Sequence, residues 1–168
     1  MIRILGAALI AGCGCWMGER KARTLRERER VLKELSEGLE QLRRELELLQ
    51  TPLPQLFRRL EQTARYPMKE LFSVCADWTR EEREGISFLW REQVDRLVQL
   101  AAEDRYVLAS LGEVLGRYPA REQGEAIRNV CVYLKQQGEG AEQAYRRMGK
   151  VYRGLGAASG GLLVILLL

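Results

Sequence analysis

A run of leucines between residues 25 and 49 constrains this chain most. Its members are Leu25, Leu32, Leu35, Leu39, Leu42, Leu46 and Leu49, at spacings of 7, 3, 4, 3, 4 and 3 residues. This alternation of three and four is a heptad pattern, which places an apolar seam along one face of a helix. The seam is broken where Arg28 takes the place of a leucine. Another helix has to cover it, either in an ordinary bundle or in a coiled-coil stalk.

Prolines divide the following part of the chain into shorter helical stretches. Thr51-Pro52-Leu53-Pro54 ends the leucine helix and starts the next one, with Thr51 expected as its N-cap. Further breaks stand at Tyr66-Pro67 and Tyr118-Pro119. From residue 120 onward there is no proline, and apolar residues recur at heptad-like spacing as far as residue 151. The sustained alternation of period two that marks strands is missing.

These patterns predict an all-α fold, a helical bundle of about six helices. The leucine helix and the helix from residue 120 match in length, so we expect them to pair antiparallel. Both continue into apolar ends, residues 1–18 and 154–168, which we predict to be two short transmembrane segments. Residues 19–153 then form the helical domain between them. A buried core helix is the alternative for the last segment.

The charge distribution predicts on which side of a membrane the domain lies. Residues 19–30 carry six Arg or Lys against three Glu, and residues 141–153 carry four against one. Basic residues beside membrane spans mark the cytoplasmic side, so the central domain is expected in the cytoplasm. A cleaved signal peptide and a lipoprotein modified at Cys13 are the alternatives, and both fit these charges less well.

Glycines at fixed spacing stand in both apolar ends. Gly14 and Gly18 form a small-xxx-small pair in the first segment, and Gly156 and Gly160 form one in the last. Such pairs allow membrane helices to approach closely. The four glycines are therefore candidates for packing between membrane helices, although they also simply suit packing in lipid.

The residues that would carry catalysis are not found. The 168 residues contain no histidine, and we find no phosphate-binding glycine loop, nucleophile elbow or metal-ligand spacing. Carboxylates such as Glu40 stand at helical spacing from basic residues such as Arg44, as on a solvated face. We therefore expect no enzyme activity, cofactor or metal.

Nucleic acid is not expected as a partner either. The basic excess flanks the apolar ends instead of covering the body of the domain. Trp78 and Trp90 are interpreted as core anchors, not as a platform for stacking bases. A membrane-tethered nucleic-acid adaptor that uses Arg20–Arg30 is a minor alternative.

In the absence of catalytic residues, an assembly or docking role is favoured. The loops Thr51–Pro54 and Arg117–Ala120 are expected together at the far end of the two paired helices. The candidate docking residues are Thr51, Pro52, Pro54, Arg117 and Arg121. The simpler interpretation is that the prolines merely turn the chain.

Several local patterns, taken in order, resemble the stage III sporulation protein AB family. The matching residues are Trp16-Met17-Gly18-Glu19, the leucine seam ending in Thr51-Pro52-Leu53, Pro67 with Leu71-Phe72, Trp90, Leu108-x-x-Leu111-Gly112-x-x-Leu115-Gly116, Gln123 and the closing run Gly160–Leu167. The chain departs from the family at Arg117-Tyr118-Pro119, where an acidic residue is usual. It also departs at Gly149, where a polar or charged residue is common.

This resemblance implies a component of the secretion-like channel complex that joins mother cell and forespore during sporulation. It also implies a helical domain similar to the inner-membrane platform protein of type II secretion and type IV pilus machines. The implied location is the mother-cell membrane around the forespore. The implied partners are the lipid bilayer, the cytosolic ATPase (stage III sporulation protein AA) and other channel components. A generic membrane-anchored helical scaffold or tether without a secretion role is the alternative.

Overall fold

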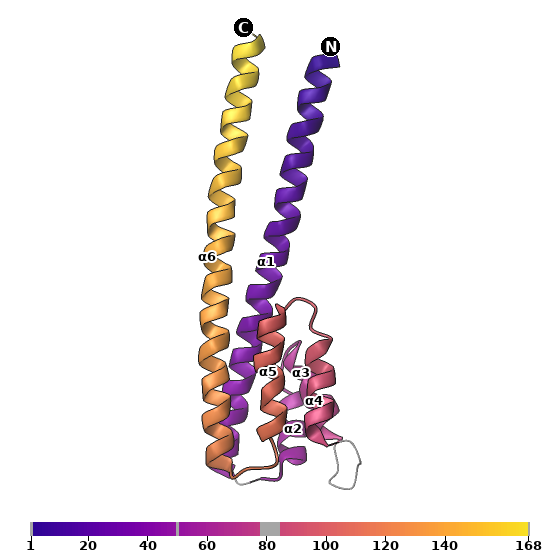
Figure 1. Ribbon diagram of the computed structural model, residues 1–168, viewed down its shortest axis with the longest axis vertical. Coiled ribbons are helices and arrows are strands. Elements are labelled where there is room, and N and C mark those ends of the chain that lie inside the picture. Colours follow the sequence, from indigo (N-terminus) through magenta and orange to yellow (C-terminus); the bar gives the residue numbers. More distant parts are fainter. Residues whose placement is uncertain (1, 50, 78–84, 168) are drawn as a thin grey trace. The chain divides into compact units, whose positions relative to one another are not determined.

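The chain is helical throughout the part that the structure describes. This computed structural model describes the backbone of residues 2–49, 51–77 and 85–167, and the side-chain surroundings of residues 23–48, 51–77 and 85–148. The helices are α1 (Ile2–Leu49), α2 (Leu53–Glu61), α3 (Met68–Ala76), α4 (Ile86–Asp95), α5 (Ala102–Val114) and α6 (Ala120–Leu167) (Figure 1). The described backbone contains no strand. The prediction of an all-α fold of about six helices, with long helices at both ends, is confirmed.

The chain divides into two compact units. One unit consists of residues 1–29 and 139–168, and the other consists of residues 30–138. The first contains the beginning of α1 and the end of α6, and both chain termini lie at one end of it (Figure 1). The second contains the remainder of α1 and α6 and all four short helices.

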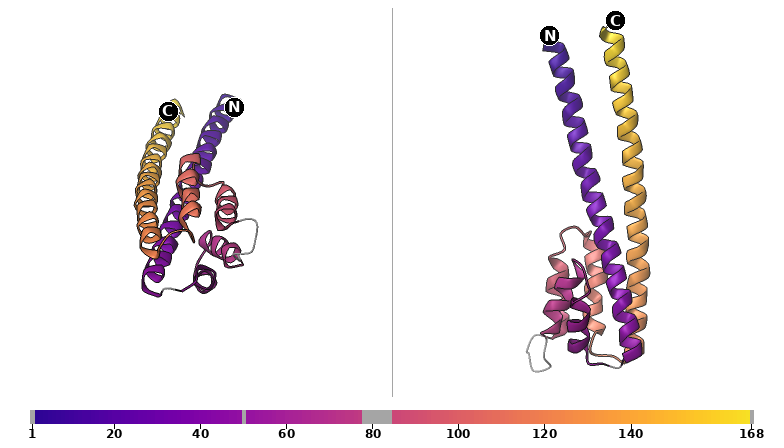
Figure 2. Two further views of the ribbon diagram at one scale, coloured as in Figure 1. Left: turned by 60° about the horizontal axis from the view of Figure 1, so that its bottom comes forward. Right: turned by 180° about the vertical axis from the view of Figure 1, so that it is seen from behind.

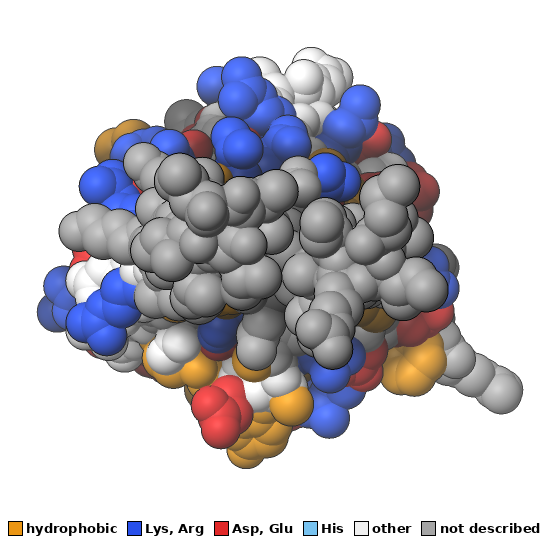
Figure 3. All heavy atoms as spheres, turned by 90° about the horizontal axis from the view of Figure 1, so that it is seen from above, with side chains coloured by type: hydrophobic (Ala, Val, Ile, Leu, Met, Phe, Trp, Pro, Cys, Tyr) orange, Lys and Arg blue, Asp and Glu red, His pale blue; other side chains and the backbone are white. Residues whose placement is uncertain are grey.

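The apolar ends fall largely outside the described side chains. Within the described residues, no helix has a stretch both long enough and apolar enough to cross a membrane. Side chains of residues 1–22 and 149–168 lie outside that description. The spans predicted at 1–18 and 154–168, and the domain limits that follow from them, stay predictions. Figure 3 views the molecule from the side of the termini, with Lys and Arg side chains at several places among the described atoms.

Within the unit of residues 30–138, α1 and α6 lie side by side and antiparallel. The Cys131 thiol of α6 faces the backbone oxygen of Ser36 of α1 at 3.6 Å. Towards the end of α1, a Cβ added at Gly124 would meet the Glu47 carboxylate oxygen at 2.6 Å. In the other direction, a Cβ added at Gly138 would meet Leu32 at 3.8 Å. Residue numbers rise along one helix as they fall along the other, so the predicted antiparallel pairing is confirmed in this unit.

Burial of the leucine seam explains this pairing. Leu32, Leu35, Leu39, Leu42 and Leu46 are all buried, while Leu25 is half-buried and the side chain of Leu49 lies outside the description. From α6, Ile127, Val130, Cys131 and Leu134 join the same core. Each fully buried leucine contributes about 1.5–3 kcal/mol relative to an exposed one, so the seam is a main source of stability for the unit.

The four short helices pack in succession against one another, α2 on α3, α3 on α4 and α4 on α5 (Figure 2). The rings of Phe57 and Phe72 stack with centroids 5.7 Å apart. Trp90 is fully buried, and its indole nitrogen donates a hydrogen bond of 2.8 Å to the backbone oxygen of Leu108. Trp90 is thus a core anchor, as predicted. Trp78 lies outside the described residues.

Candidate docking surface

The two predicted docking loops lie at the same end of the bundle. α1 ends at Leu49 and α6 begins at Ala120, and the contact between Glu47 and Gly124 places these two helix ends beside each other. The connections from α1 to α2 and from α5 to α6 therefore leave the bundle together (Figure 1). Antiparallel pairing of two helices brings together loops that are more than 60 residues apart in sequence.

The first loop is held by one buried leucine between two accessible prolines. Pro52 is exposed, Pro54 and Thr51 are half-buried, and Leu53 is buried. The expectation that Thr51 is the N-cap of α2 is wrong, because the N-cap is Pro52, which makes no side-chain cap hydrogen bond. Pro54 has no N–H to be capped, and the Gln55 N–H already donates to the Pro52 oxygen at 3.0 Å.

The second loop is a sharp corner between α5 and α6. Gly116 has φ of 76°, a left-handed conformation that side chains with a Cβ rarely adopt. Gln123, in the first turns of α6, closes the corner with both ends of its amide. Its oxygen accepts from the Gly116 N–H at 3.2 Å, and its nitrogen donates to the Tyr118 backbone oxygen at 2.5 Å.

This corner displays basic and aromatic side chains. Arg117, Tyr118 and Pro119 are exposed. The Arg117 side chain makes no hydrogen bond or ion pair with any residue that the structure describes. The Arg121 side chain is 90% exposed and pairs with Glu125 at 3.5 Å, an exposed pair that holds a side chain only weakly. Both guanidinium groups are therefore accessible to a partner.

A network of charges on α1 lies just before this end. Arg43 donates to Glu40 at 2.7 Å and to both carboxylate oxygens of Glu47 at 2.9 Å. These hydrogen bonds hold the pKa of Glu40 below its ordinary value and raise the pKa of Arg43. The sequence suggested Arg44 as the partner of Glu40, and Arg43 takes that place. Arg43 is therefore committed within the protein, unlike Arg117.

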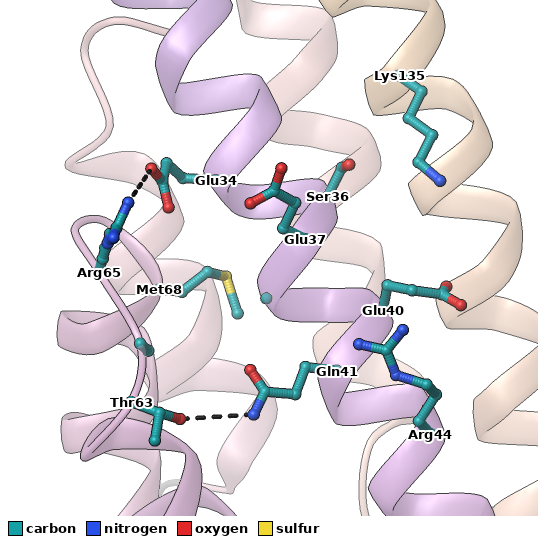
Figure 4. A pocket seen from close by; sticks show the side chains of 12 residues that line it. Glu34, Ser36, Glu37, Glu40, Gln41, Arg44, Thr63, Arg65, Met68 and Lys135 are labelled. Carbon is teal, nitrogen blue, oxygen red and sulfur yellow. Dashed lines mark hydrogen bonds and ion pairs between the residues drawn. The ribbon is translucent and has the colours of Figure 1, made fainter.

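A polar groove of about 540 Å³ runs between α1, the connection from α2 to α3, and α6 (Figure 4). Its lining includes Glu34, Glu37, Arg65 and Lys135. Arg65 pairs with Glu34 at 3.9 Å, and Gln41 donates to the Thr63 hydroxyl at 3.4 Å across the groove. Sequence reasoning missed this groove because its lining comes from three separate segments. Its acidic and basic groups face one another, which leaves no single charge to select a ligand.

The described cysteines are poorly suited to act as nucleophiles or metal ligands. Cys75 and Cys131 are buried free thiols, and burial raises their pKa to about 12 and about 11. A thiol that stays protonated is a poor nucleophile and a poor metal ligand. Among the described residues, no group of three or more His, Cys, Asp or Glu side chains is placed to hold a metal ion.

Comparison with known proteins identifies the family. The sequence profile described as "Stage III sporulation protein AB (spore_III_AB)" matches residues 3–168. The chain belongs to this family. It is 27% identical to stage III sporulation protein AB of Bacillus subtilis (strain 168) over 171 residues, which covers 100% of both chains. A solved structure of stage III sporulation protein AB (SpoIIIAB) superposes with a TM-score of 0.61 at 24% identity, over 71% of this chain and 97% of that one, and supports the fold.

Several residues by which the chain resembles the stage III sporulation protein AB family have structural roles here. Leu108, Leu111 and Leu115 are buried. At Gly112 an added Cβ would lie 3.1 Å from the backbone of Ser87, so α4 and α5 approach closely. Gly116 and Gln123 build the corner. Gly14, Gly18, Gly156 and Gly160 lie outside the described side chains, and their proposed role in membrane packing stays a prediction.

Proposed function

We propose that this member of the stage III sporulation protein AB family is a membrane-anchored docking component of the channel complex between mother cell and forespore. Family membership gives the chain a role in sporulation. The apolar ends with their basic flanks support anchoring in the mother-cell membrane around the forespore, with residues 19–153 in the cytoplasm. Gly14, Gly18, Gly156 and Gly160 are the proposed packing positions of the anchors.

The observation that carries the proposal is the convergence of the two loops at one end of the bundle. The end presents prolines from one loop, the unpaired guanidinium group of Arg117 from the other, and the exposed guanidinium group of Arg121 from the start of α6. A helix pair within residues 30–138 with a docking surface at its end suits a protein that transmits position or force between partners. The proposed partners are the cytosolic ATPase, stage III sporulation protein AA, and other channel components. A helical tether without a secretion role is the second candidate.

Charge reversal tests the docking surface. Replacing Arg117 and Arg121 with Glu should weaken binding of the full chain, in a mild detergent, to the ATPase by about tenfold or more, since like charges across an interface repel. Lys33→Glu with Lys69→Glu is the matched control, because both lysines are exposed and lie elsewhere on α1 and α3. Unchanged affinity at physiological salt for the arginine variant would place the docking surface elsewhere.

Topology is tested separately by labelling Ser110→Cys in a chain with Ser at positions 13 and 15. Ser110 is exposed, whereas Cys75 and Cys131 are buried. An impermeant thiol reagent should label position 110 in permeabilised cells and not in intact ones. Labelling of intact cells would contradict a cytoplasmic domain.

A further inference from the structure

Gln123 occupies an unusual place for a polar side chain. It stands on α6 with only 6% of its surface exposed, yet its amide reaches back to two backbone groups of the corner, the Gly116 N–H and the Tyr118 oxygen. Arg117, whose side chain is free, lies between these two contacts, and the side chain of Tyr118, the second contact, is 51% exposed. A buried side chain thus fixes the backbone from which exposed groups project.

The hydrogen bonds at the corner require both the donor and the acceptor of a glutamine side chain. A carboxamide accepts through its oxygen and donates through its nitrogen, and the corner offers one donor and one acceptor at the required places. Glutamate of the same shape lacks the donor for Tyr118, and methionine of similar length lacks both functions. Backbone bonds from the Arg117 N–H to Val114 at 3.2 Å and from the Gln123 N–H to Pro119 at 3.1 Å complete the turn.

We infer that Gln123 is a positioning residue for partner binding, which fixes the corner so that Arg117 meets an acidic surface of the ATPase. This inference rests on the proposed function and names how the same surface is organised. A loop that is ordered before binding loses less conformational entropy when the complex forms. The partner surface that fits carries carboxylates for Arg117, with an apolar area for the ring of Tyr118.

A double-mutant cycle separates positioning from general stability. Gln123→Met and Arg117→Ala are made singly and together in the full chain, and the dissociation constant for stage III sporulation protein AA is measured in a mild detergent. Gln123→Met should weaken binding about threefold to tenfold, as expected for losing one well-ordered element of an interface. The double variant should bind no more weakly than the weaker single variant, because a disordered corner no longer presents Arg117.

Two further variants keep the result interpretable. Gln136→Met, on an exposed position of α6, controls for an added apolar side chain and should bind like the parent. Gln123→Glu retains the acceptor for Gly116 and loses the donor for Tyr118, and replaces the methionine variant if that one does not fold. Amide exchange at Gly116 should accelerate in the methionine variant and not in the Gln136 control.

The outcomes distinguish this inference from the proposed function. Independent, multiplying losses in the cycle would show that Gln123 does not act through Arg117 and would overturn the inference. Weaker binding with Arg117→Ala but unchanged binding for both Gln123 variants would do the same and leave the docking surface standing. No loss with Arg117→Ala or with the charge-reversed arginine pair would overturn the docking surface, and the inference with it.

Discussion

The leucine seam of α1 and the corner between α5 and α6 hold the same unit together by different means. The seam consists of one residue type repeated, and its members within this unit, Leu32, Leu35, Leu39, Leu42 and Leu46, contribute through burial alone. The corner consists of Gly116, Gln123 and the backbone between them, joined by hydrogen bonds of defined direction. Burial is non-directional, whereas a hydrogen bond depends on angle and distance. The stability of the seam should therefore be sensitive to substitution by polar side chains. The stability of the corner should be sensitive to changes of backbone conformation.

Leu39→Asp is the most severe test of the seam. Leu39 is fully buried, so the carboxylate would be taken out of water without a partner while a cavity replaces the leucine. We expect a loss of about 4 kcal/mol or more, enough to unfold the unit. Thermal unfolding of the full chain measures it. Leu48→Asp on the same helix is the control, since Leu48 is 78% exposed and should change stability by less than about 1 kcal/mol. Equal losses of stability for Leu39→Asp and Leu48→Asp would show that burial of the seam is not what makes Leu39 important.

Gly38→Ala tests how tightly the other side of α1 is packed. An added Cβ at Gly38 would lie 2.4 Å from Cγ and 3.0 Å from Cβ of Met68 on α3. Met68 is buried and cannot simply swing away, so we expect a loss of about 1–3 kcal/mol from overpacking. Chemical denaturation measures it. In the Met68→Ala background the same change should cost clearly less, and equal costs would show that Met68 is not the obstacle.

The sequence was sufficient for the features that are periodic. The leucine spacings predicted a buried helical face, and the same argument paired α1 with α6, because both depend on repetition over many residues. The groove beside Glu34 and the contact of Gly38 with Met68 were not predictable in this way. They depend on where α2 and α3 pack against α1, and no local sequence pattern predicts that position.

The candidate docking residues illustrate the same limit. Their location at one end followed from the antiparallel pairing, so the sequence placed Arg117 at the same end of the bundle as the first loop. The hydrogen bonds of Gln123 to the corner did not follow, although the residue belonged to the resemblance to the family. A hydrogen bond from a helix side chain back to the preceding turn can be identified only when the conformation of that turn is known. Thr51 shows the opposite error: its pattern predicted the N-cap of α2, and the N-cap is the next residue, Pro52.

Gly116→Ala probes the backbone of the corner directly. At φ of 76° a residue with a Cβ is strained, and we expect a loss of about 1–2 kcal/mol. Thermal unfolding checks the loss. Asn tolerates the left-handed conformation better than Ala, so Gly116→Asn should lose less than Gly116→Ala. The reverse order would mean that the strain of the backbone conformation is not what makes glycine favourable here.

Gly140→Ala should act in the opposite direction, with the smallest effect. Gly140 stands within α6, and an added Cβ would meet nothing within 4 Å. Alanine is favoured over glycine in a helix by about 0.5–1 kcal/mol, so this variant should unfold at a slightly higher temperature than the parent. Gly124→Ala on the same helix is the comparison and should gain less, because its Cβ would lie 2.6 Å from the Glu47 carboxylate, which would have to move. If Gly140→Ala destabilised the protein as Gly116→Ala does, glycine would be required at position 140 for a reason other than local space. The corner would then no longer be distinguished by its backbone conformation.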